Sequence, residues 1–447
     1  MTRRSDVLKP FEQKKAFMED RVRHGIEQNR KGTASLHFKD AEGREVNGAH
    51  IEIRQKTHDF HYGANLFMLD EFNSEEQNQA YRKYFAETFN MATLPFYWSD
   101  LEPEQGKPRF AKDSPKVYRR PAPDLCLEYC EANGIEPKAH CLNYAHFTPQ
   151  WAKGDIWKEK HLLDKRFREL AERYSGRIRD WEVTNETFWG MRIPGYCTFY
   201  DQDDFIEWSF ETAERYFHTN RLIINEAHSR IWDNEHYQGN RSPYYMQIER
   251  AIRNGARIDC IGMQFHMFYR AEKEAEETAQ FYDPERIFDV LDTYAKLGRS
   301  IQITELTIPA YAYTEEDEEI QAEIIRHLYS MWFSHPAMEA ILYWNLADGF
   351  AHGAKQGDMT AGENYFHGGL LRYDFTPKAS CRTIQDLFQK VWRTNLSLDT
   401  ETDGLAFKGF YGTYELEITA DGKTEKRDIH LDRHSNNKFD IIEVIST

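Results

Sequence analysis

Long apolar runs and an excess of basic residues are both missing from this chain. No stretch of about 18 apolar residues, the length that a membrane-spanning helix needs, occurs among its 447 residues. Its formal net charge is −17, whereas binding to nucleic acid or to an anionic membrane surface relies on clustered Lys and Arg. We therefore expect neither nucleic acid nor a membrane as a partner, and a neutral ligand stays compatible with this charge.

Cysteine motifs, a secretory signal and a nucleotide-binding loop are also absent. The six cysteines form no CxxC pair; they are Cys126, Cys130, Cys141, Cys197, Cys260 and Cys381. Cys126 and Cys130 could supply half of a metal site from one helix, but no second Cys or His pair follows nearby, so apolar packing is favoured. The basic N-terminus is not followed by the apolar segment of a signal peptide, and no GxGxxG follows an expected strand. These absences indicate a reduced, cytoplasmic protein without a cofactor.

The chain is long enough for one large domain and a smaller one. Residues 1–31 are rich in Lys, Arg and Glu and predict a polar helix. Residues 32–56 alternate apolar and polar side chains around a turn, which predicts a β-hairpin. Residues 394–447 repeat this pattern, with Asp421-Gly422 as a tight turn. We expect both terminal stretches to combine in one small β-sandwich beside a main domain at 57–393.

The main domain alternates between short apolar runs and segments with helical spacing. One such helical segment carries Ile287, Phe288, Leu291 and Tyr294 three or four residues apart. Eight runs are expected to be buried strands: 58–67, 89–98, 136–144, 179–186, 221–227, 258–266, 300–306 and 338–346. Eight strands alternating with helices predict the α/β class and a closed (β/α)8 TIM barrel rather than an open sheet.

Polar or aromatic side chains follow six consecutive strands of the predicted barrel. Active sites of such barrels lie at the C-terminal ends of the strands. The residues at these ends are His140 and Tyr144, Asn185 and Glu186, Asn225 and Glu226, Gln264 and His266, Glu305, and Trp344 and Asn345. Because six successive ends carry such groups on one face, we predict a functional site there.

Glu186 and Glu305 are carboxylates expected on opposite sides of the barrel mouth. Cleavage of a glycosidic bond needs one carboxylic acid to protonate the leaving oxygen and one carboxylate to attack or to activate water. In retaining enzymes the two groups lie ~5–5.5 Å apart and the nucleophile forms a covalent intermediate. Repulsion and burial would raise the pKa of one, so that it acts as an acid near neutral pH. The pair predicts a glycoside hydrolase.

Five motifs stand at these strand ends: WSDLEPEQG, HCLNYAHFTPQW, WEVTNE, IGMQFH and ITEL. Together they resemble motifs of glycoside hydrolase family 10, the endo-β-1,4-xylanase family. WEVTNE at 181–186 is similar to its acid/base signature, ITEL at 303–306 to its nucleophile motif, and IGMQFH at 261–266 to its strand-six motif. The other two are similar to its strand-two exit and strand-three signature. The resemblance covers roughly residues 57–393.

The resemblance implies a retaining hydrolase of β-linked, xylan-like glycosides, and it assigns roles to single residues. Glu186 would be the acid/base and Glu305 the nucleophile. Asn185 would bond the sugar 2-hydroxyl, and His140 would contact the sugar in the −1 subsite, next to the bond that is cut. Gln264 and His266 would orient the two carboxylates by hydrogen bonds. The indole face of Trp344 would form the floor of the −1 subsite.

Several positions depart from the family's pattern on the side of the −2 and −1 sugars. Where family members hold these sugars with a Glu-Asn pair and a Met-Lys-Trp run, residues 93–98 read TLPFYW, so that Tyr97 replaces the Lys. Tyr144-Ala145 replaces the family's Trp-His, and Thr307 replaces an Asp that supports the strand-six His. His352 falls near the second Trp of the final loop. We predict substrate-binding roles for Tyr97 and Tyr144 in an altered −2/−1 pocket, and a glycoside different from or smaller than xylan.

Two other functions stay open. A metal-dependent barrel hydrolase would use the numerous histidines, although His58 and His61 stand early in the first strand rather than at its end as His-x-His; metal analysis of the purified protein distinguishes it. The histidines concerned are His58, His61, His140, His146, His228 and His266. A non-catalytic carbohydrate-binding barrel would not need both Glu186 and Glu305, and activity on aryl glycosides distinguishes it.

Overall fold

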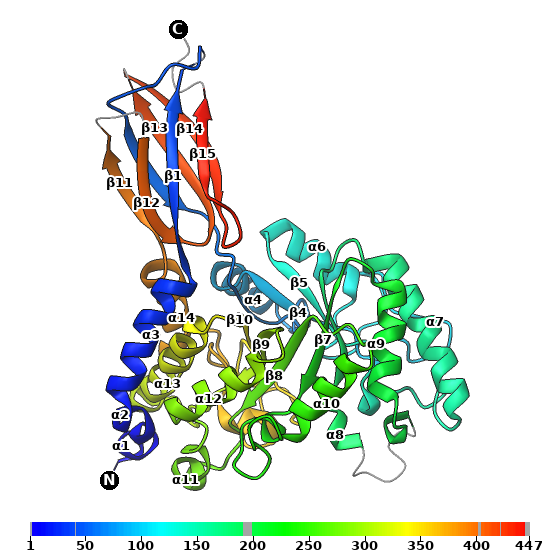
Figure 1. The fold of residues 1–447 in the computed structure, drawn as a ribbon. Coiled ribbons are helices and arrows are strands. Elements are labelled where there is room, and N and C mark those ends of the chain that lie inside the picture. The colour runs from blue at the N-terminus through cyan, green and yellow to red at the C-terminus, as the bar shows by residue number, and fades with distance from the viewer. Residues whose placement is uncertain (1, 41, 191–198, 401–403, 421, 443–447) are drawn as a thin grey trace. The chain divides into compact units, whose positions relative to one another are not determined.

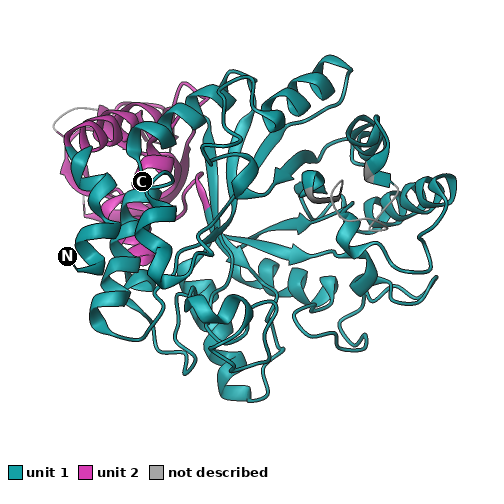
Figure 2. Cartoon of the chain, turned by 90° about the horizontal axis from the view of Figure 1, so that it is seen from below, with its two compact units in different colours: residues 1–15, 62–329, 337–382 teal, residues 16–61, 330–336, 383–447 magenta. Residues whose placement is uncertain are grey.

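The structure, a computed structural model, describes residues 2–40, 42–190, 199–400, 404–420 and 422–442. Contacts divide the chain into two compact units, each built from separate stretches of sequence (Figure 2). The barrel unit comprises Met1–Lys15, Tyr62–Tyr329 and Ala337–Arg382, and the sandwich unit comprises Ala16–His61, Ser330–Pro336 and Thr383–Thr447. Cys197 lies outside the described residues, and the other five cysteines are buried and free.

Eight strands close into a barrel in the order β10-β3-β4-β5-β6-β7-β8-β9 (Figure 1). Almost all of their residues are buried, because the barrel interior covers one face of a parallel strand and helices cover the other. The predicted (β/α)8 barrel is confirmed, and each of the eight apolar runs overlaps one strand. The strands are β3 (His61–Asn65), β4 (Met91–Pro95), β5 (Glu136–His140), β6 (Asp180–Asn185), β7 (Arg221–Glu226), β8 (Cys260–His266), β9 (Ser300–Thr307) and β10 (Met338–Tyr343).

Helices alternate with these strands along the chain, and several begin at a side chain that caps free backbone N–H groups. The Ser74 hydroxyl accepts from Gln77, and the Asp155 carboxylate from Lys158. Gly134 ends a helix in the left-handed conformation that glycine adopts without strain. None of the helices among the described residues is long and apolar enough to cross a membrane. The helices after β3 are α4 (Glu75–Thr88), α5 (Trp98–Leu101), α6 (Pro123–Asn133), α7 (Ile156–Tyr174), α8 (Thr187–Gly190), α9 (Phe205–Tyr216), α10 (Pro243–Arg253), α11 (Glu274–Thr278), α12 (Pro284–Ala295), α13 (Glu315–Ser334) and α14 (Ala379–Asp386).

The N-terminal segment forms three consecutive helices, α1 (Arg3–Val7), α2 (Lys9–Gln13) and α3 (Lys15–Asn29). The single helix predicted for residues 1–31 is therefore interrupted twice. Pro10 lies in the first turn of α2, the one part of a helix where a missing backbone N–H is tolerated, so it marks a new start.

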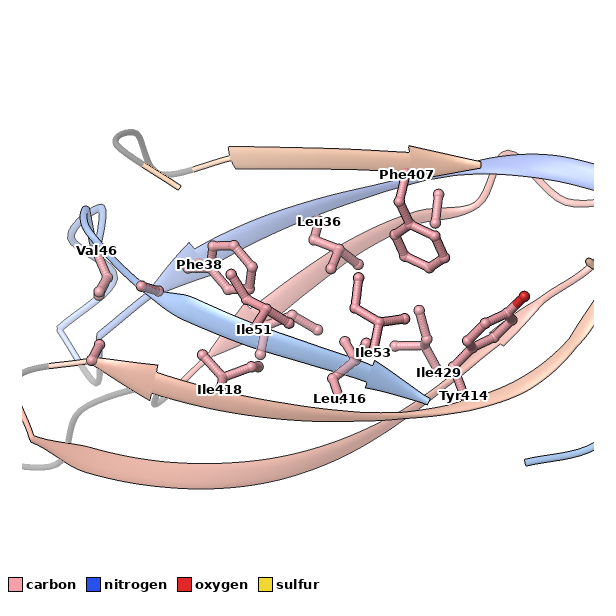
Figure 3. Packing of buried hydrophobic residues seen from close by; sticks show 14 of the residues in the cluster. Leu36, Phe38, Val46, Ile51, Ile53, Phe407, Tyr414, Leu416, Ile418 and Ile429 are labelled. Carbon is pink, nitrogen blue, oxygen red and sulfur yellow. The ribbon is translucent and has the colours of Figure 1, made fainter. Parts of the chain in front are cut away.

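The sandwich unit consists of two sheets that pack their apolar faces together. One sheet has the order β12-β1-β15 and the other β11-β2-β13-β14. Side chains from both, including Leu36, Phe38, Ile51, Ile53 and Leu416, form one core (Figure 3). The strands are β1 (Lys31–Lys39), β2 (His50–Gln55), β11 (Asn395–Asp399), β12 (Gly404–Phe410), β13 (Gly412–Ala420), β14 (Lys423–Leu431) and β15 (Lys438–Ile442). A sandwich of strands from both terminal regions is what the sequence predicts.

The hairpin predicted at residues 32–56 is wrong, since β1 and β2 belong to different sheets. One antiparallel bridge joins Lys39 to Glu45. The chain then crosses to the opposite sheet, with Val46 and Ala49 buried in the shared core. Alternating apolar residues specify which face of a strand is buried, not which strand is its neighbour. The predicted turn residue Asp421 lies outside the described residues, although the flanking strands β13 and β14 do pair as neighbours.

Candidate active site

A cavity of about 400 Å³ lies within the barrel unit, where the C-terminal ends of its strands meet. It brings together all nine residues that the sequence predicts for the site. They are Tyr97, His140, Tyr144, Asn185, Glu186, Gln264, His266, Glu305 and Trp344. Other lining residues were not predicted to contact a ligand; among them are Phe67, Arg119, Arg120, Phe147, Phe268 and Glu363.

Glu186 follows the last residue of β6 and has a left-handed backbone, with φ of 49°. Non-glycine residues rarely adopt this conformation, and it is concentrated at functional sites. The backbone N–H of Glu186 donates to the carbonyl of Asn225 on β7, over 3.2 Å. Its Oε1 accepts from Gln264 Nε2 at 2.9 Å, and its Oε2 accepts from the hydroxyl of Tyr144. The carboxylate is therefore held from two sides by neutral donors.

Glu305 lies on β9 with only 3% of its surface exposed. Its Oε1 accepts from Gln264 Nε2 at 3.0 Å and from Asn225 Nδ2 at 3.1 Å. Its Oε2 lies 3.2 Å from His266 Nε2. Two strands, β7 and β8, thus supply three donors to this carboxylate, which fixes its orientation toward the cavity.

Burial raises the pKa of Glu305 to about 8, because a charged carboxylate loses its hydration there. The nearby carboxylates of Glu186 and Glu182 raise this pKa further, while His140 and Lys138 lower it. We expected burial and repulsion to raise the pKa of one carboxyl of the pair. That carboxyl is Glu305.

His266 connects Glu305 to Thr307. Burial lowers the pKa of His266 to about 4, so its imidazole is neutral at neutral pH. A neutral ring that donates from Nε2 to Glu305 must accept at Nδ1, and the Thr307 hydroxyl lies 3.0 Å from that nitrogen. Thr307 thus supports the histidine at the position where the family has an Asp.

Asn225 links the two catalytic candidates from β7, although the sequence marked it only as a strand end. Its Nδ2 donates to Asn185 Oδ1 at 2.8 Å as well as to Glu305, and its Oδ1 accepts from Thr304 at 2.6 Å. Gly262 makes room for it, because a Cβ at that position would stand 2.5 Å from Asn225 Oδ1.

A buried ionic cluster lies beneath His140. The carboxylate of Glu182 pairs with Lys138 on one oxygen and with His140 Nδ1 on the other. Burial would raise the pKa of Glu182, but the two cations outweigh it and hold this pKa at about 2. Burial lowers the pKa of His140, but Glu182 outweighs that effect and raises it. The cluster places positive charge beside Glu305.

The same cluster bears on the metal-dependent alternative. His140, Glu182 and Glu305 offer ligand atoms within 4.8 Å of one another and could hold a metal ion. The Lys138 ammonium already pairs with Glu182, so a metal cation would meet a like charge there. Of the six histidines that motivated this alternative, four line the cavity: His140, His146, His228 and His266.

Aromatic rings form one side of the cavity. Trp344 is 8% exposed and meets the ring of Phe67 edge-to-face at 5.3 Å between centroids. Tyr97 meets His140 edge-to-face at 5.1 Å, and the guanidinium of Arg120 lies 4.0 Å from the Tyr97 ring centroid. Tyr97 thus stands where family members have a Lys, and its ring packs against the guanidinium of Arg120.

Arg119 and Arg120 come from the segment between α5 and α6, which follows β4. Both side chains are buried, and Arg120 Nε donates to Asp100 at 2.8 Å. Sequence patterns did not identify them, because they follow no strand directly and belong to none of the quoted motifs. A pair of arginines next to Pro121 in an irregular segment was the one available signal.

A family model described as "Glycosyl hydrolase family 10" matches residues 59–358 of this chain. Among curated proteins, "Anti-sigma-I factor RsgI6" of Acetivibrio thermocellus is 22% identical over 90% of this chain and 47% of its own length. "Endo-1,4-beta-xylanase 2" of Arabidopsis thaliana is 23% identical over 92% of this chain and 34% of its own length. The chain thus spans between a third and a half of these two relatives.

Solved structures share the fold. Xylanase 10B from Thermotoga petrophila RKU-1, in complex with xylobiose, aligns with a TM-score of 0.59 at 20% identity, over 74% of this chain and 95% of that one. Native xylanase 10B from Thermotoga maritima aligns with a TM-score of 0.57, also at 20% identity, over 74% and 96% of the two chains. At this identity the likeness is one of fold.

Proposed function

The chain belongs to glycosyl hydrolase family 10, and from that membership we propose that it hydrolyses β-linked glycosides with retention of anomeric configuration. Glu305 attacks the anomeric carbon while Glu186 protonates the leaving oxygen, which gives a covalent glycosyl-enzyme. Glu186 then takes a proton from a water molecule that displaces Glu305, and the sugar leaves with its original configuration.

The amide of Gln264 carries this proposal, because one nitrogen donates to both carboxylates. The two bonds measure 2.9 and 3.0 Å, so the two accepting oxygens can be no farther apart than the sum of these lengths, 5.9 Å. That bound admits the ~5–5.5 Å typical of retaining glycosidases and is shorter than the ~6.5–9.5 Å that inverting enzymes need for a water molecule.

The proton of the pair has to stand on Glu186 for the first step. The two coupled carboxyls titrate as a unit, and the productive form carries one proton. Burial favours that proton on Glu305 in the free protein. A glycosidic oxygen that accepts a hydrogen bond from Glu186 favours the other arrangement in the complex, where the donors around Glu305 stabilise its charge.

We propose a xylan-like β-1,4-linked oligosaccharide as the substrate class. Family membership and relatives named endo-1,4-beta-xylanases support it, as does a fold shared with a xylanase that was solved with xylobiose. Asn185 and His140 would bind the −1 sugar and Trp344 would pack against its apolar face. The Tyr97–Arg120 contact replaces the family's Lys, so the −2/−1 pocket differs from that of a typical xylanase.

Variants of the two carboxylates test the mechanism. Glu305→Ala and Glu186→Ala should each lower turnover of β-xylosides or xylo-oligosaccharides by at least about a hundredfold. Glu207→Gln, which changes a buried carboxylate of α9 outside the cavity, should keep wild-type turnover. NMR of the first-formed product should show the substrate's anomer. An inverted product, or wild-type rates in both alanine variants, would remove Glu305 from the role of nucleophile.

A carbohydrate-binding barrel without turnover is the second candidate. One relative with 22% identity over 90% of this chain is named an anti-sigma factor, so catalysis does not follow from similarity alone. Isothermal titration with xylo-oligosaccharides, beside the turnover assays, separates the two. Binding with no turnover on any β-glycoside would favour the second candidate. Metal analysis and a chelator test the metal-dependent alternative, and we expect turnover to survive the chelator.

A further inference from the structure

A second cavity of about 390 Å³ lies in the barrel unit and shares lining residues with the active-site cavity. Arg119, Arg120 and His352 line both cavities. The second one is also lined by Lys355, and no Asp or Glu is among the described residues that line it. A chain with a net charge of −17 thus concentrates cations where the two cavities meet.

Arg119 forms no ion pair at this place within the described residues. Only 4% of the residue is exposed. Its Nη1 donates to Asn345 Oδ1 at 3.1 Å and to the carbonyl of Phe350, and its Nε has no hydrogen-bond partner. Across the described part of the chain, no carboxylate forms an ion pair with it. A buried charge without an ion pair is costly, and the φ of Arg119, 63°, adds a conformation that non-glycine residues rarely adopt.

Two carboxylates face this pair of arginines, and neither forms an ion pair with Arg119 among the described residues. Asp100 pairs with Arg120 at 2.8 Å. Burial lowers the pKa of Arg119, and the opposite charge of Glu363 only partly offsets this. The Oε2 of Glu363 accepts from Asn345 Nδ2 at 3.2 Å and from the backbone N–H of His352 at 3.3 Å, not from Arg119. Lys355 is exposed and forms no ion pair within the described residues. Arg119 and Lys355 therefore remain as the cations available to a ligand.

We propose that this meeting point of the two cavities, the anionic subsite, binds the carboxylate of a uronic acid residue of the glycan. The proposal rests on the proposed function and extends it to substrate specificity. A guanidinium presents a planar fork of N–H donors that matches a carboxylate. Arg119 and Arg120 follow β4, the strand whose exit holds the −2 and −1 sugars in the family, so the uronate lies on that side of the cut bond.

Repulsion by Glu186 and Glu305 also favours binding of an anionic group at this subsite. Glu186 and Glu305 repel an anionic substituent, while the cations of the anionic subsite attract it. A uronosyl unit within the chain and a uronosyl branch both present the same carboxylate. The sugar that bears it is then set at a fixed distance from the bond that is cut, which determines the cleavage position.

Binding to the Glu305→Gln protein tests the proposal without turnover. Titration calorimetry compares a xylo-oligosaccharide bearing a glucuronosyl branch with the same compound after reduction of its carboxyl group to an alcohol. We expect the acid to bind at least about tenfold more tightly at low salt, with the difference shrinking as salt rises. The same measurement with a linear oligosaccharide that ends in a uronic acid shows whether the subsite binds a uronosyl unit of the main chain or a uronosyl branch.

Two variants then locate the effect. We expect two variants of the Glu305→Gln protein, Arg119→Met and Lys355→Glu, to reduce the preference for the acid over its reduced form. In Arg119→Met the acid should bind less than about twofold more tightly than the alcohol. Arg166→Met is the control for the loss of a buried arginine, since Arg166 bonds backbone carbonyls and lines neither cavity. Lys296→Glu is the control for net charge, because Lys296 is exposed on the barrel unit outside both cavities.

Equal affinity of the acid and its reduced form for the Glu305→Gln protein would overturn the proposal, as would a preference that both variants leave unchanged. If Arg119→Met does not fold, the proposal is judged on the preference of the Glu305→Gln protein for the acid and on whether Lys355→Glu reduces that preference. Hydrolysis of neutral xylo-oligosaccharides by the wild-type protein reports on the proposed function separately. Absence of hydrolysis together with a clear acid preference would contradict the proposed function and still support the anionic subsite.

Discussion

At the scale of single residues, Glu305 is the carboxyl group whose charge the protein disfavours most strongly within the cavity. Burial raises its pKa to about 8, and the charge of Glu186 contributes to that rise. The donors from Gln264, Asn225 and His266 favour the ionised form but do not restore the hydration that burial removes. The ionisation of Glu305, the proposed nucleophile, therefore depends on the charge of Glu186, and this dependence can be measured.

Glu186→Gln should move the acidic limb of the pH–rate profile to lower pH. Removal of the Glu186 charge lowers the pKa of Glu305, so the nucleophile ionises at lower pH. The profile of kcat/KM for an aryl glycoside with a good leaving group reports this, because its departure needs no general acid. Glu207→Gln should leave the limb in place. If the acidic limb stays in place or moves to higher pH in Glu186→Gln, the charge of Glu186 does not raise the pKa of Glu305.

Thr307→Val tests whether the hydroxyl that supports His266 matters for the reaction. Valine has the same shape but leaves His266 Nδ1 buried without its 3.0 Å partner. We expect kcat to fall about tenfold and the free energy of unfolding to fall by about 1–3 kcal/mol. Thr293→Val removes another buried hydroxyl, which bonds Tyr237 at 2.9 Å outside the cavity. It should lower stability without changing kcat; equal kcat in both variants would contradict the role of Thr307.

At the scale of elements, β7 positions the start of α8 directly after Glu186. One oxygen of Glu226 accepts from the Thr187 backbone N–H at 2.8 Å and from its hydroxyl at 3.0 Å, and more distantly from the Phe188 N–H at 3.4 Å. These bonds fix the turn on which Glu186 adopts its φ of 49°. Glu186, the proposed acid/base, is thus held by a carboxylate of the neighbouring strand that is not among the residues lining the cavity.

Glu226→Gln should lower kcat by about ten- to a hundredfold while KM changes little. The amide keeps one acceptor oxygen but places an NH2 group where the carboxylate accepts, so the turn that carries Glu186 shifts. Steady-state kinetics on xylo-oligosaccharides measure both constants. Glu207→Gln serves as the control, since it is buried on α9 next to β6 and outside the cavity. A change confined to KM would indicate a role in binding instead.

The barrel strands were predictable from the sequence because each combines a short apolar run with a polar end. This pattern also located eight of the nine predicted cavity residues, since the strand ends of a barrel converge, while Tyr97 was predicted from the comparison with the family's motif. The partner strand of β1 was not predictable, because alternation carries no information about which strand lies next to it. Arg119 was missed because it follows no strand directly, and Lys138 because its partner Glu182 stands on another strand, far away in the sequence.

At the scale of the whole molecule, buried titratable groups in the barrel unit set how stability depends on pH. Burial raises the pKa of Glu305 to about 8 and that of Glu226 to about 7, so the folded protein holds protons that an unfolded carboxyl, with a pKa of about 4.3, has released. Burial lowers the pKa of His228 to about 3 and of His266 to about 4, so these imidazoles stay neutral where an unfolded histidine, with a pKa of about 6.5, is charged.

The two acids and the two histidines have opposite effects on the free energy of unfolding in one pH window, and only one of these two pairs acts on either side of it. Between about pH 4.5 and 6.5 the folded state gains protons on the two acids and lacks them on the two histidines, so the slopes cancel. Above about pH 6.5 only the acids contribute, and the free energy of unfolding should fall as pH rises through 7 and 8. Below about pH 4.5 the histidines dominate, and it should fall as pH falls. Glu182, with a pKa of about 2, adds to that loss.

Glu305→Gln should make the decline between pH 6.5 and 8 shallower, because it removes one of the protons that acids of the folded state retain there. Each such proton contributes a slope of about 1.4 kcal/mol per pH unit. Urea unfolding at several pH values, followed by intrinsic fluorescence, gives the slopes of the two proteins. Thr293→Val, which removes no titratable group, should shift the whole curve without changing its slope. An unchanged slope in Glu305→Gln would mean that Glu305 is already ionised in the folded protein at neutral pH. The proton needed for the first chemical step would then have to reside on Glu186 before any substrate binds.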